Sequence, residues 1–389
     1  MNKKVSIVFG YRDREFIRVK RCLDSLVNQT FMDFDVIFID YGSSDSFAKD
    51  IKPLVESYSF ANYYYACTIG YPWNRSHALN IGVRLSGSEY ILFGDIDLIY
   101  SPDVVQGLVS EAKKESVVFA SVYWLNKSYS KWESLSHMNT SKLDDSGDSL
   151  GAVCLVHKEI LENIRGFDEY YAFWGVEDRD LHHRITSLGI SSTRINKKKY
   201  PIYHQWHPIA SNRRKNFFPE KWWDDMNIHY ALNEHIIQRN REDWGKPVEK
   251  SDRPVLRAKE VVFEIPFDYA KSYQKPELYS QMLSSLSKLS TNECLRIEIR
   301  QNNIPPIVQH CIHYLNMCFR IIRFPLGIDS IVDVEREAFF YPQVDIVYVI
   351  WQLMKKDNVI KDYYIRNEAN KMVIKLMMKE AYRLNTHII

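Results

Sequence analysis

Short apolar runs alternate with amphipathic stretches through the first half of the chain. Residues 5–9 and 34–40 are rich in Val, Ile and Phe, which is typical of buried strands. Over 16–26 and 76–85, apolar residues recur at helical spacing. More strands are expected at 63–65, 90–93, 117–123 and 151–156, with helices at 158–164 and from 177 onwards. This alternation predicts an α/β fold: a mostly parallel, doubly wound sheet with helices on both faces.

The pattern changes after residue 248. The polar run 249–254 ends in a proline and predicts a linker. Beyond it, 261–265 and 295–299 are typical of strands, whereas 344–354 and 367–384 are typical of helices. We therefore expect two domains, 1–248 and 249–389, the second a smaller α+β or helical domain of unknown role.

Composition narrows the class of protein. Of the 389 residues, 46% are hydrophobic, and the formal net charge is only +2, so no strong overall field would attract nucleic acid. The six cysteines have no paired spacing, which favours a reducing compartment. No run approaches the roughly 20 apolar residues of a membrane span, and 5–9 is too short for a signal peptide core. We expect a cytoplasmic protein.

Charged side chains follow several predicted strands at the points where those strands end. Because the carboxyl ends of parallel strands share one edge of the sheet, these side chains should converge on one cleft. Two acids one residue apart at such an edge invite a cation, although this spacing is also common by chance. The residues expected at the edge are Arg12, Arg14, Asp40, Asp95 and Asp97.

Two histidines provide further candidate metal ligands. His204 and His207 are spaced to bind one ion from a turn or a helical face, and imidazole is a common ligand of divalent transition metals. Alone, such a pair is more often structural. With Asp97 it would form a set of two histidines and one carboxylate, with coordination positions left open for diphosphate oxygens.

The stretch 173–184 places an aromatic ring beside acids. Glu177 and Asp178 fall in the first turn of a predicted helix, where the helix dipole favours negative charge, so they have a purely structural explanation. Trp174 beside Gly175 is not explained in this way. A ring next to a carboxylate suits a sugar, because the ring covers an apolar face while the acid accepts a hydroxyl proton.

In their order and approximate spacing these motifs resemble a known family. Residues 3 to about 220 are similar to glycosyltransferases of the GT-A type, with a family 2-like front half. The back half resembles the C-terminal module of β-1,4-galactosyltransferases and of bacterial chondroitin-type polymerases. The similarity is carried by residues 11–14, 74–82, 95–99, Gly166-Phe167, 174–178 and His207.

The resemblance implies a donor site for a UDP-sugar. Arg75 would meet the diphosphate or the sugar, and Asp95 the ribose or the sugar. Asp97 and His207 would bind Mn2+ or Mg2+, and His204 falls where the galactosyltransferases have a Met ligand. The nucleotide end would be held by Tyr11, Arg12, Arg14 and Asp40.

The resemblance also implies the reaction. Asp178 would act as the general base on a hydroxyl of a glycan acceptor, giving a β-linkage with inversion. Glu177 would bind sugar hydroxyls, and Trp174 would form the floor of the pocket. The implied enzyme is a hexosyltransferase or N-acetylhexosaminyltransferase that extends a bacterial-type surface glycan. A lipid-linked acceptor would add peripheral contact with the inner face of the cytoplasmic membrane; the oligomeric state is not predicted.

Three departures from the family pattern stand out. Tyr41 occupies the position of a second acid after Asp40, and Val176 replaces the second glycine of a Gly-Gly pair. The Gln-x-x-Arg-Trp signature of processive membrane synthases is absent from the sequence, which favours single additions. Ser149 lies near the position where a Tyr crowds the donor's C2 group in galactosyltransferases, so we expect room for an N-acetyl group.

Two other functions remain open from the sequence. One is a non-catalytic carbohydrate-binding or scaffold protein on a transferase fold, although simple binding needs no general base. The other is a sugar-nucleotide nucleotidyltransferase, which would be expected to have a Gly-rich basic loop after the first strand. Here that loop reads Phe9-Gly10-Tyr11-Arg12, which contains a single glycine.

Overall fold

The structure is a computed structural model that describes residues 2–129, 140, 143–147, 150–173, 175–207, 222–263, 275–300, 359–368 and 371–380. It contains two compact units. The first comprises Met1–Asn216 and Trp223–Glu249, and the second comprises Phe217–Trp222 and Lys250–Ile389. Trp174, Ser149 and the helix predicted at 344–354 lie outside the described residues.

A seven-stranded sheet with the order β3-β2-β1-β4-β8-β6-β9 forms the centre of the first unit. β8 pairs antiparallel with β4 and β6, whereas the other pairings are parallel. The prediction of a mostly parallel α/β sheet is therefore confirmed. The strands are β1 (Val5–Tyr11), β2 (Phe34–Tyr41), β3 (Ala61–Ala66), β4 (Tyr90–Gly94), β6 (Ser116–Ala120), β8 (Val153–His157) and β9 (Ser191–Arg194).

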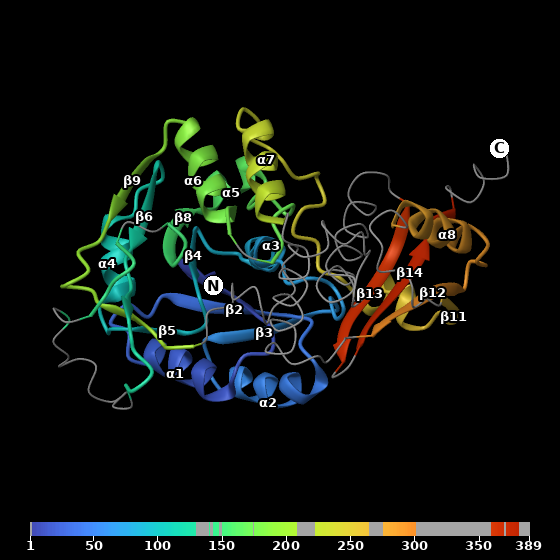
Figure 1. Cartoon of the computed structure of the whole chain (residues 1–389). Helices are drawn as coiled ribbons and strands as arrows, with labels where there is room; N and C mark the ends of the chain where they lie inside the picture. The colour runs from blue at the N-terminus through green and yellow to red at the C-terminus, as the bar shows by residue number, and fades with distance from the viewer. Residues whose placement is uncertain are drawn as a thin grey trace, which may run out of the picture. The chain divides into compact units, whose positions relative to one another are not determined.

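Helices cover both faces of this sheet, as predicted (Figure 1). One face packs against α1 (Phe16–Val27), α2 (Asp45–Glu56) and α4 (Val104–Glu111). The opposite face packs against α3 (Arg75–Leu85), α5 (Lys158–Ile164) and α6 (Glu177–Ser187). The helices can pack on both sides because successive side chains of a strand point to opposite faces, and every residue of β4 is buried.

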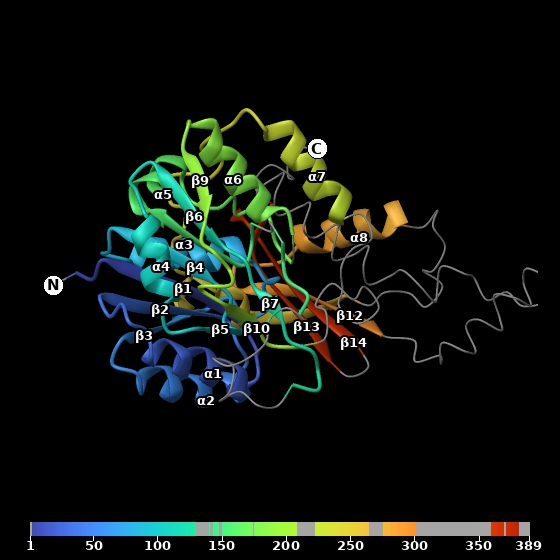
Figure 2. The same ribbon diagram turned by 90° about the vertical axis from the view of Figure 1, so that its left-hand side faces the viewer.

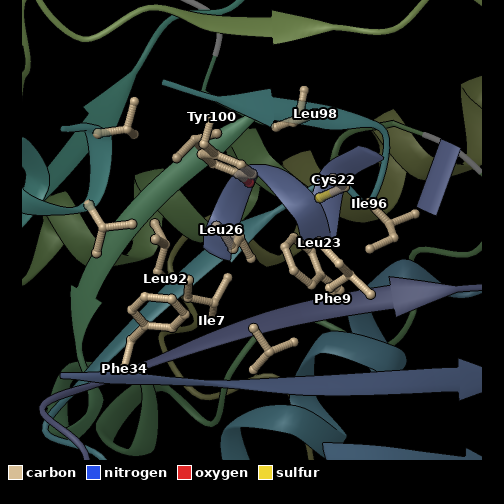
Figure 3. Packing of buried hydrophobic residues seen from close by; sticks show 14 of the residues in the cluster. Ile7, Phe9, Cys22, Leu23, Leu26, Phe34, Leu92, Ile96, Leu98 and Tyr100 are labelled. Carbon is tan, nitrogen blue, oxygen red and sulfur yellow. The ribbon is translucent and has the colours of Figure 1, made fainter. Parts of the chain in front are cut away.

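The packing of α1 on the sheet shows how the amphipathic pattern is used. Leu23 and Leu26 are fully buried and lie close to Ile7 and Phe9 of β1 (Figure 3). Val8, between these two β1 residues, belongs to the core on the other face. This alternation fixes the register of β1, and so places the polar residues that follow it at the carboxyl edge.

A small sheet with the order β5-β10-β7 stands beside the central one (Figure 2). β5 (Leu98–Tyr100) pairs antiparallel with β10 (Ile202–His204), which pairs parallel with β7 (Tyr123–Trp124). The strand predicted at 117–123 is confirmed as far as Ala120, where β6 ends, but the chain then enters another sheet at Tyr123. The pairing of His204 with Leu98 brings the histidine region next to the acids after β4.

The second unit contains a four-stranded sheet with the order β11-β12-β14-β13. β11 and β12 confirm the strands predicted there. The helix predicted at 367–384 is wrong: the described part is mainly β-structure, because β14 is an almost continuous apolar run, and such a run has no period that separates strand from helix. The elements are β11 (Lys259–Phe263), α8 (Lys275–Ser287), β12 (Glu293–Arg300), β13 (Ile360–Glu368) and β14 (Lys371–Met378).

The segment 249–254, predicted as a linker, contains local structure and a buried charge. The segment forms short 3-10 helices at Lys250–Asp252 and Pro254–Leu256. Between them Arg253 is fully buried, and its Nε donates to Oδ1 of Asp362 at 3.0 Å. The polar sequence suggests a solvated segment, but the charge of Arg253 is buried against its partner, Asp362, which lies more than a hundred positions away in the chain.

Among the residues that the structure describes, no helix combines the length and the apolar composition needed to cross a bilayer.

Candidate active site

The polar residues predicted at the sheet's carboxyl edge lie where the strands end. β1 ends at Tyr11, β2 at Tyr41 and β4 at Gly94. Because β8 runs in the opposite direction, its first residue, Val153, pairs with Gly94, and the residues just before β8 reach the same edge. Side chains from β1, β2, β4 and the β8 approach can therefore meet there.

Asp97, His204 and His207 form the candidate metal site. One ligand atom from each residue can be chosen so that all lie within 4.8 Å of one another. Nε2 of His204 is 3.5 Å from Oδ1 of Asp97, and Nε2 of His207 is 3.2 Å from Oδ2. The backbone holds the set together, because His204 pairs with Leu98 and the N–H of Gln205 donates to the carbonyl of Asp97.

The protonation states of this set suit a divalent cation. Burial raises the pKa of Asp97, but the hydrogen bond from His207 and the charge of His204 outweigh it and lower the pKa overall. Burial lowers the pKa of His204 more than Asp97 raises it, which favours a neutral imidazole with a free lone pair. Oδ1 of Asp97 is buried without a hydrogen-bond partner among the described residues, as expected of an oxygen that binds an ion. The residues therefore fit a metal.

Arg75 joins two of the predicted acids into one cluster. It is the first residue of α3, a helix capped by Asn74, whose Oδ1 accepts from the N–H of His77 at 2.8 Å. Its Nε is 3.2 Å from Oδ1 of Asp95, and its Nη1 is 2.9 Å from Oδ1 of Asp178. Asp95 and Asp178, which are far apart in the sequence, are thereby brought to one place.

Asp95 experiences opposing effects within this cluster. Burial raises its pKa most strongly, Arg75 lowers it, and the charges of Asp97 and Asp178 raise it again, to about 6. The side chain of Asp95 is nevertheless 40% exposed to solvent, so solvent weakens the effect of burial on its pKa. An exposed carboxylate beside the metal set is placed to accept hydroxyl groups of a ligand.

Glu177 keeps its proton to a higher pH than Asp95 does. Burial and the neighbouring charge of Asp178 raise its pKa to about 7, although Arg75 lowers it. Near neutral pH it can therefore donate as well as accept a hydrogen bond. That property suits the binding of sugar hydroxyls.

We expect Glu177→Gln to stabilise the protein more at pH 8 than at pH 4.5. A raised pKa means that the folded state binds the proton more tightly, so the stability contributed by protonated Glu177 falls as pH rises from about 4.5 to about 7. Gln has no charged form that burial would disfavour. The stabilisation by Glu177→Gln, measured as the free energy of unfolding, should therefore be larger at pH 8 than at pH 4.5 by about 3 kcal/mol at most. Urea unfolding at both pH values measures it. The exposed Glu111→Gln is the control, and an identical effect of Glu177→Gln at both pH values would contradict the assignment.

The loop before α6 is held in an unusual backbone conformation. Gly175 has φ of +95° and Val176, at the N-cap of α6, has φ of +74°. A Cβ on Gly175 would lie 2.7 Å from the Trp223 ring, so a larger residue does not fit. Val176 occupies a left-handed conformation that favours glycine, at a typical cost of about 1–3 kcal/mol. This strain is the structural consequence of the missing second glycine, and it sets the start of the helix that carries Asp178.

The residues predicted to hold the nucleotide form a second group at the edge. Asp40 is fully buried and accepts from the N–H of Ser43 at 2.9 Å and from the Tyr63 hydroxyl at 2.7 Å. Burial raises its pKa, against the effect of these hydrogen bonds. Tyr11 is also buried, and its hydroxyl donates to the carbonyl of Arg14 at 2.9 Å. Arg14 in turn helps to lower the pKa of Asp97, which places its charge near the metal set.

The guanidinium of Arg12, which is predicted to hold the nucleotide, is engaged with the protein's own backbone. It donates to the carbonyl oxygens of Tyr41, Thr68 and Tyr71. The guanidinium also lies 5.0 Å from the centre of the Tyr41 ring. Arg12 thus shapes the loops of the nucleotide group, and a direct contact with a nucleotide stays a prediction.

Sequence reasoning missed Gly151. A Cβ at this position would lie 2.2 Å from Oδ2 of Asp178, and its carbonyl accepts from Nη2 of Arg75 at 3.0 Å. A glycine before an apolar run indicates only a turn in the sequence. Its role depends on Asp178, 27 positions later, so no local pattern could have revealed it.

A family model described as "Glycosyl transferase family 2" matches residues 14–218. The match covers more than half of the 389 residues, so the chain belongs to glycosyl transferase family 2.

Among solved structures, the chain is similar to GalNAc-T7, whose crystal structure is described as being with UDP, GalNAc and Mn2+. The identity is 12% and the TM-score is 0.41, over 59% of this chain and 51% of that one. The chain thus matches about half the length of that protein.

Proposed function

We propose that this protein is a metal-dependent, inverting glycosyltransferase that moves a sugar from a UDP-sugar to a glycan or lipid-linked glycan acceptor. One observation carries the proposal beyond family membership. Asp97, His204 and His207 form the candidate metal set, and Asp97 is two positions after Asp95 in the chain. Arg75 links Asp95 to Asp178 by contacts with both carboxylates. A candidate cation site and a candidate base on the same edge of the sheet support the proposal.

The reaction would be a single displacement at C1 of the donor sugar. Asp178 takes the proton of the acceptor hydroxyl while the oxygen of that hydroxyl forms a bond to C1. The bond between C1 and the UDP oxygen breaks at the same time, and its electron pair leaves on the diphosphate. Mn2+ or Mg2+ at Asp97, His204 and His207 would offset the charge that grows on that diphosphate. Attack from the face opposite UDP gives a β-linkage.

Other residues would bind the two substrates. Asp95, Glu177 and Trp174 are assigned to the sugars, and the nucleotide end to Tyr11, Arg12, Arg14 and Asp40. The proposal includes a back half similar to the module of galactosyltransferases and chondroitin polymerases. It also includes a transferase domain at 1–248 and a separate domain of unknown role at 249–389. The enzyme would act at the cytoplasmic face of a membrane.

UDP release tests the proposed function. The protein is incubated with Mn2+ and a panel of UDP-sugars that includes the N-acetylated ones, with and without candidate glycan acceptors, and UDP is measured. We expect release from at least one donor, stimulated by an acceptor and abolished by EDTA. Ligand binding without UDP release would favour a carbohydrate-binding protein, and formation of a nucleotide sugar from UTP and a sugar phosphate would favour a nucleotidyltransferase.

A further inference from the structure

Arg75 connects three segments that are distant in the sequence. Its nitrogens contact Asp95 after β4, Asp178 in the first turn of α6, and the carbonyl of Gly151 before β8. Only 15% of its side chain is exposed. A largely buried guanidinium with three oxygen partners is a rigid connector, because its fork geometry sets the direction of each partner.

Gly151 supplies the second half of this arrangement. Oδ2 of Asp178 occupies the space where a side chain at residue 151 would begin. An ideal Cβ on Gly151 would lie 2.2 Å from Oδ2 of Asp178 and 3.0 Å from Cγ of Asp178. The other carboxylate oxygen, Oδ1, receives Nη1 of Arg75. One oxygen of Asp178 is thus held by a hydrogen bond, and the other lies against a residue without a side chain.

We propose that Arg75 and Gly151 are positioning residues that together form a seat for Asp178 and fix its orientation toward the acceptor hydroxyl. This inference rests on the proposed function, in which Asp178 is the base. It assigns to Arg75 a role other than the direct donor contact that the family resemblance implies. Gly151, which no motif includes, becomes a determinant of turnover.

The charge balance around the seat supports this role for Arg75. Asp95, Asp178 and Glu177 bring three carboxyl groups together, and each of them influences the Arg75 guanidinium, whose pKa is raised by their charges despite the opposing effect of burial. Burial, followed by the charge of Asp178, raises the pKa of the Cys154 thiol on β8 to about 12, so this thiol stays neutral. Arg75 is therefore the cation that lets these acids share one site.

Gly151→Ala tests the seat with the smallest possible change. We expect kcat to fall by roughly 10²-fold, because displacing a catalytic group by about 1 Å has an effect of that size, while the donor KM changes less than threefold. Gly87→Ala is the control, since a Cβ there would meet only the flexible side chain of exposed Asn2. Wild-type kcat in Gly151→Ala would overturn the proposal.

Arg75→Ala separates positioning from donor binding. We expect a kcat loss that is partly restored by guanidinium ion at tens of millimolar but not by equal sodium chloride, because the free ion can refill the fork. In the Asp178→Asn background the same substitution should lower kcat far less than it does alone. A large rise in donor KM with kcat retained would instead make Arg75 a donor contact and refute the inference.

A stability measurement keeps this test independent of turnover. The melting temperatures of Arg75→Ala, Asp178→Asn and the double variant are compared without substrate. We expect the double variant to lose clearly less than the sum of the single losses, because the two groups share one ion pair. Additive losses would reject the ion pair even if no UDP-sugar is turned over, whereas failure of the proposed function would appear only as absent UDP release in the wild type.

Discussion

Asp178→Asn should lower the rate of sugar transfer by roughly 10²- to 10⁴-fold, the usual contribution of a general base. Asn has the shape of Asp and can still accept the hydrogen bond from Nη1 of Arg75, so the seat remains filled. What it loses is the ability to take the acceptor proton. Binding of UDP with Mn2+ should stay within about twofold of the wild type, because Asp178 is not one of the proposed metal or nucleotide ligands.

Two comparisons make this prediction specific. Asp243→Asn changes an exposed acid in the same unit and should leave transfer unaffected. Initial rates at saturating donor and acceptor give kcat, and calorimetry gives UDP affinity. If Asp178→Asn retains turnover within tenfold of the wild type, the base is misassigned, and the kcat of Glu177→Gln would then show whether the neighbouring acid serves instead.

Asp97→Asn should raise the Mn2+ concentration for half-maximal activity by at least roughly 10²-fold. Replacing a residue that only hydrogen-bonds to a metal ligand typically costs about 10- to 100-fold in metal affinity, and Asp97 is a candidate direct ligand as well as the only carboxylate of the set. The neutral amide keeps the size of the side chain, so the fold around this buried position is preserved. His207→Ala and His204→Ala should also weaken Mn2+-dependent binding of UDP, each removing one imidazole.

Titration of activity with Mn2+ and with Mg2+ measures this effect. His235→Ala, which removes an exposed histidine of the same unit, is the control. Because His204 stands where the galactosyltransferases have a softer Met ligand, we also expect Mg2+ to support more activity here than in those enzymes. Full activity of Asp97→Asn in the presence of EDTA would show that the reaction needs no ion at this site.

The sequence predicted the fold of the first unit well because its strands are short and separated by amphipathic helices. Residues 90–93 are buried on both faces, yet the turn at Gly94 and the flanking helices identify them as a strand. Beyond residue 248 the strands β11 and β12 follow the prediction, but the helix predicted at 367–384 is β-structure in its described part. The apolar run of β14 has no period, and Arg253 looks solvated until its partner Asp362 is known.

The site was predictable only in part, for a physical reason. Asp97 and the two histidines could be paired because their residue types share one chemistry, and the structure brings them within ligand distance. Gly151 and the bridging geometry of Arg75 could not be predicted, since they follow from the antiparallel direction of β8 and the start of α6. Steric fit between distant segments leaves no pattern in the sequence.

Binding of UDP in the presence and absence of Mn2+ tests the central claim most directly. The wild-type protein is titrated with UDP by calorimetry, first with Mn2+ and then with EDTA in its place, and Asp97→Asn is titrated with UDP in the presence of Mn2+. The account predicts saturable binding with Mn2+ that is lost in EDTA and strongly weakened in Asp97→Asn. UDP binding of equal strength under all three conditions, or no binding under any of them, would contradict it.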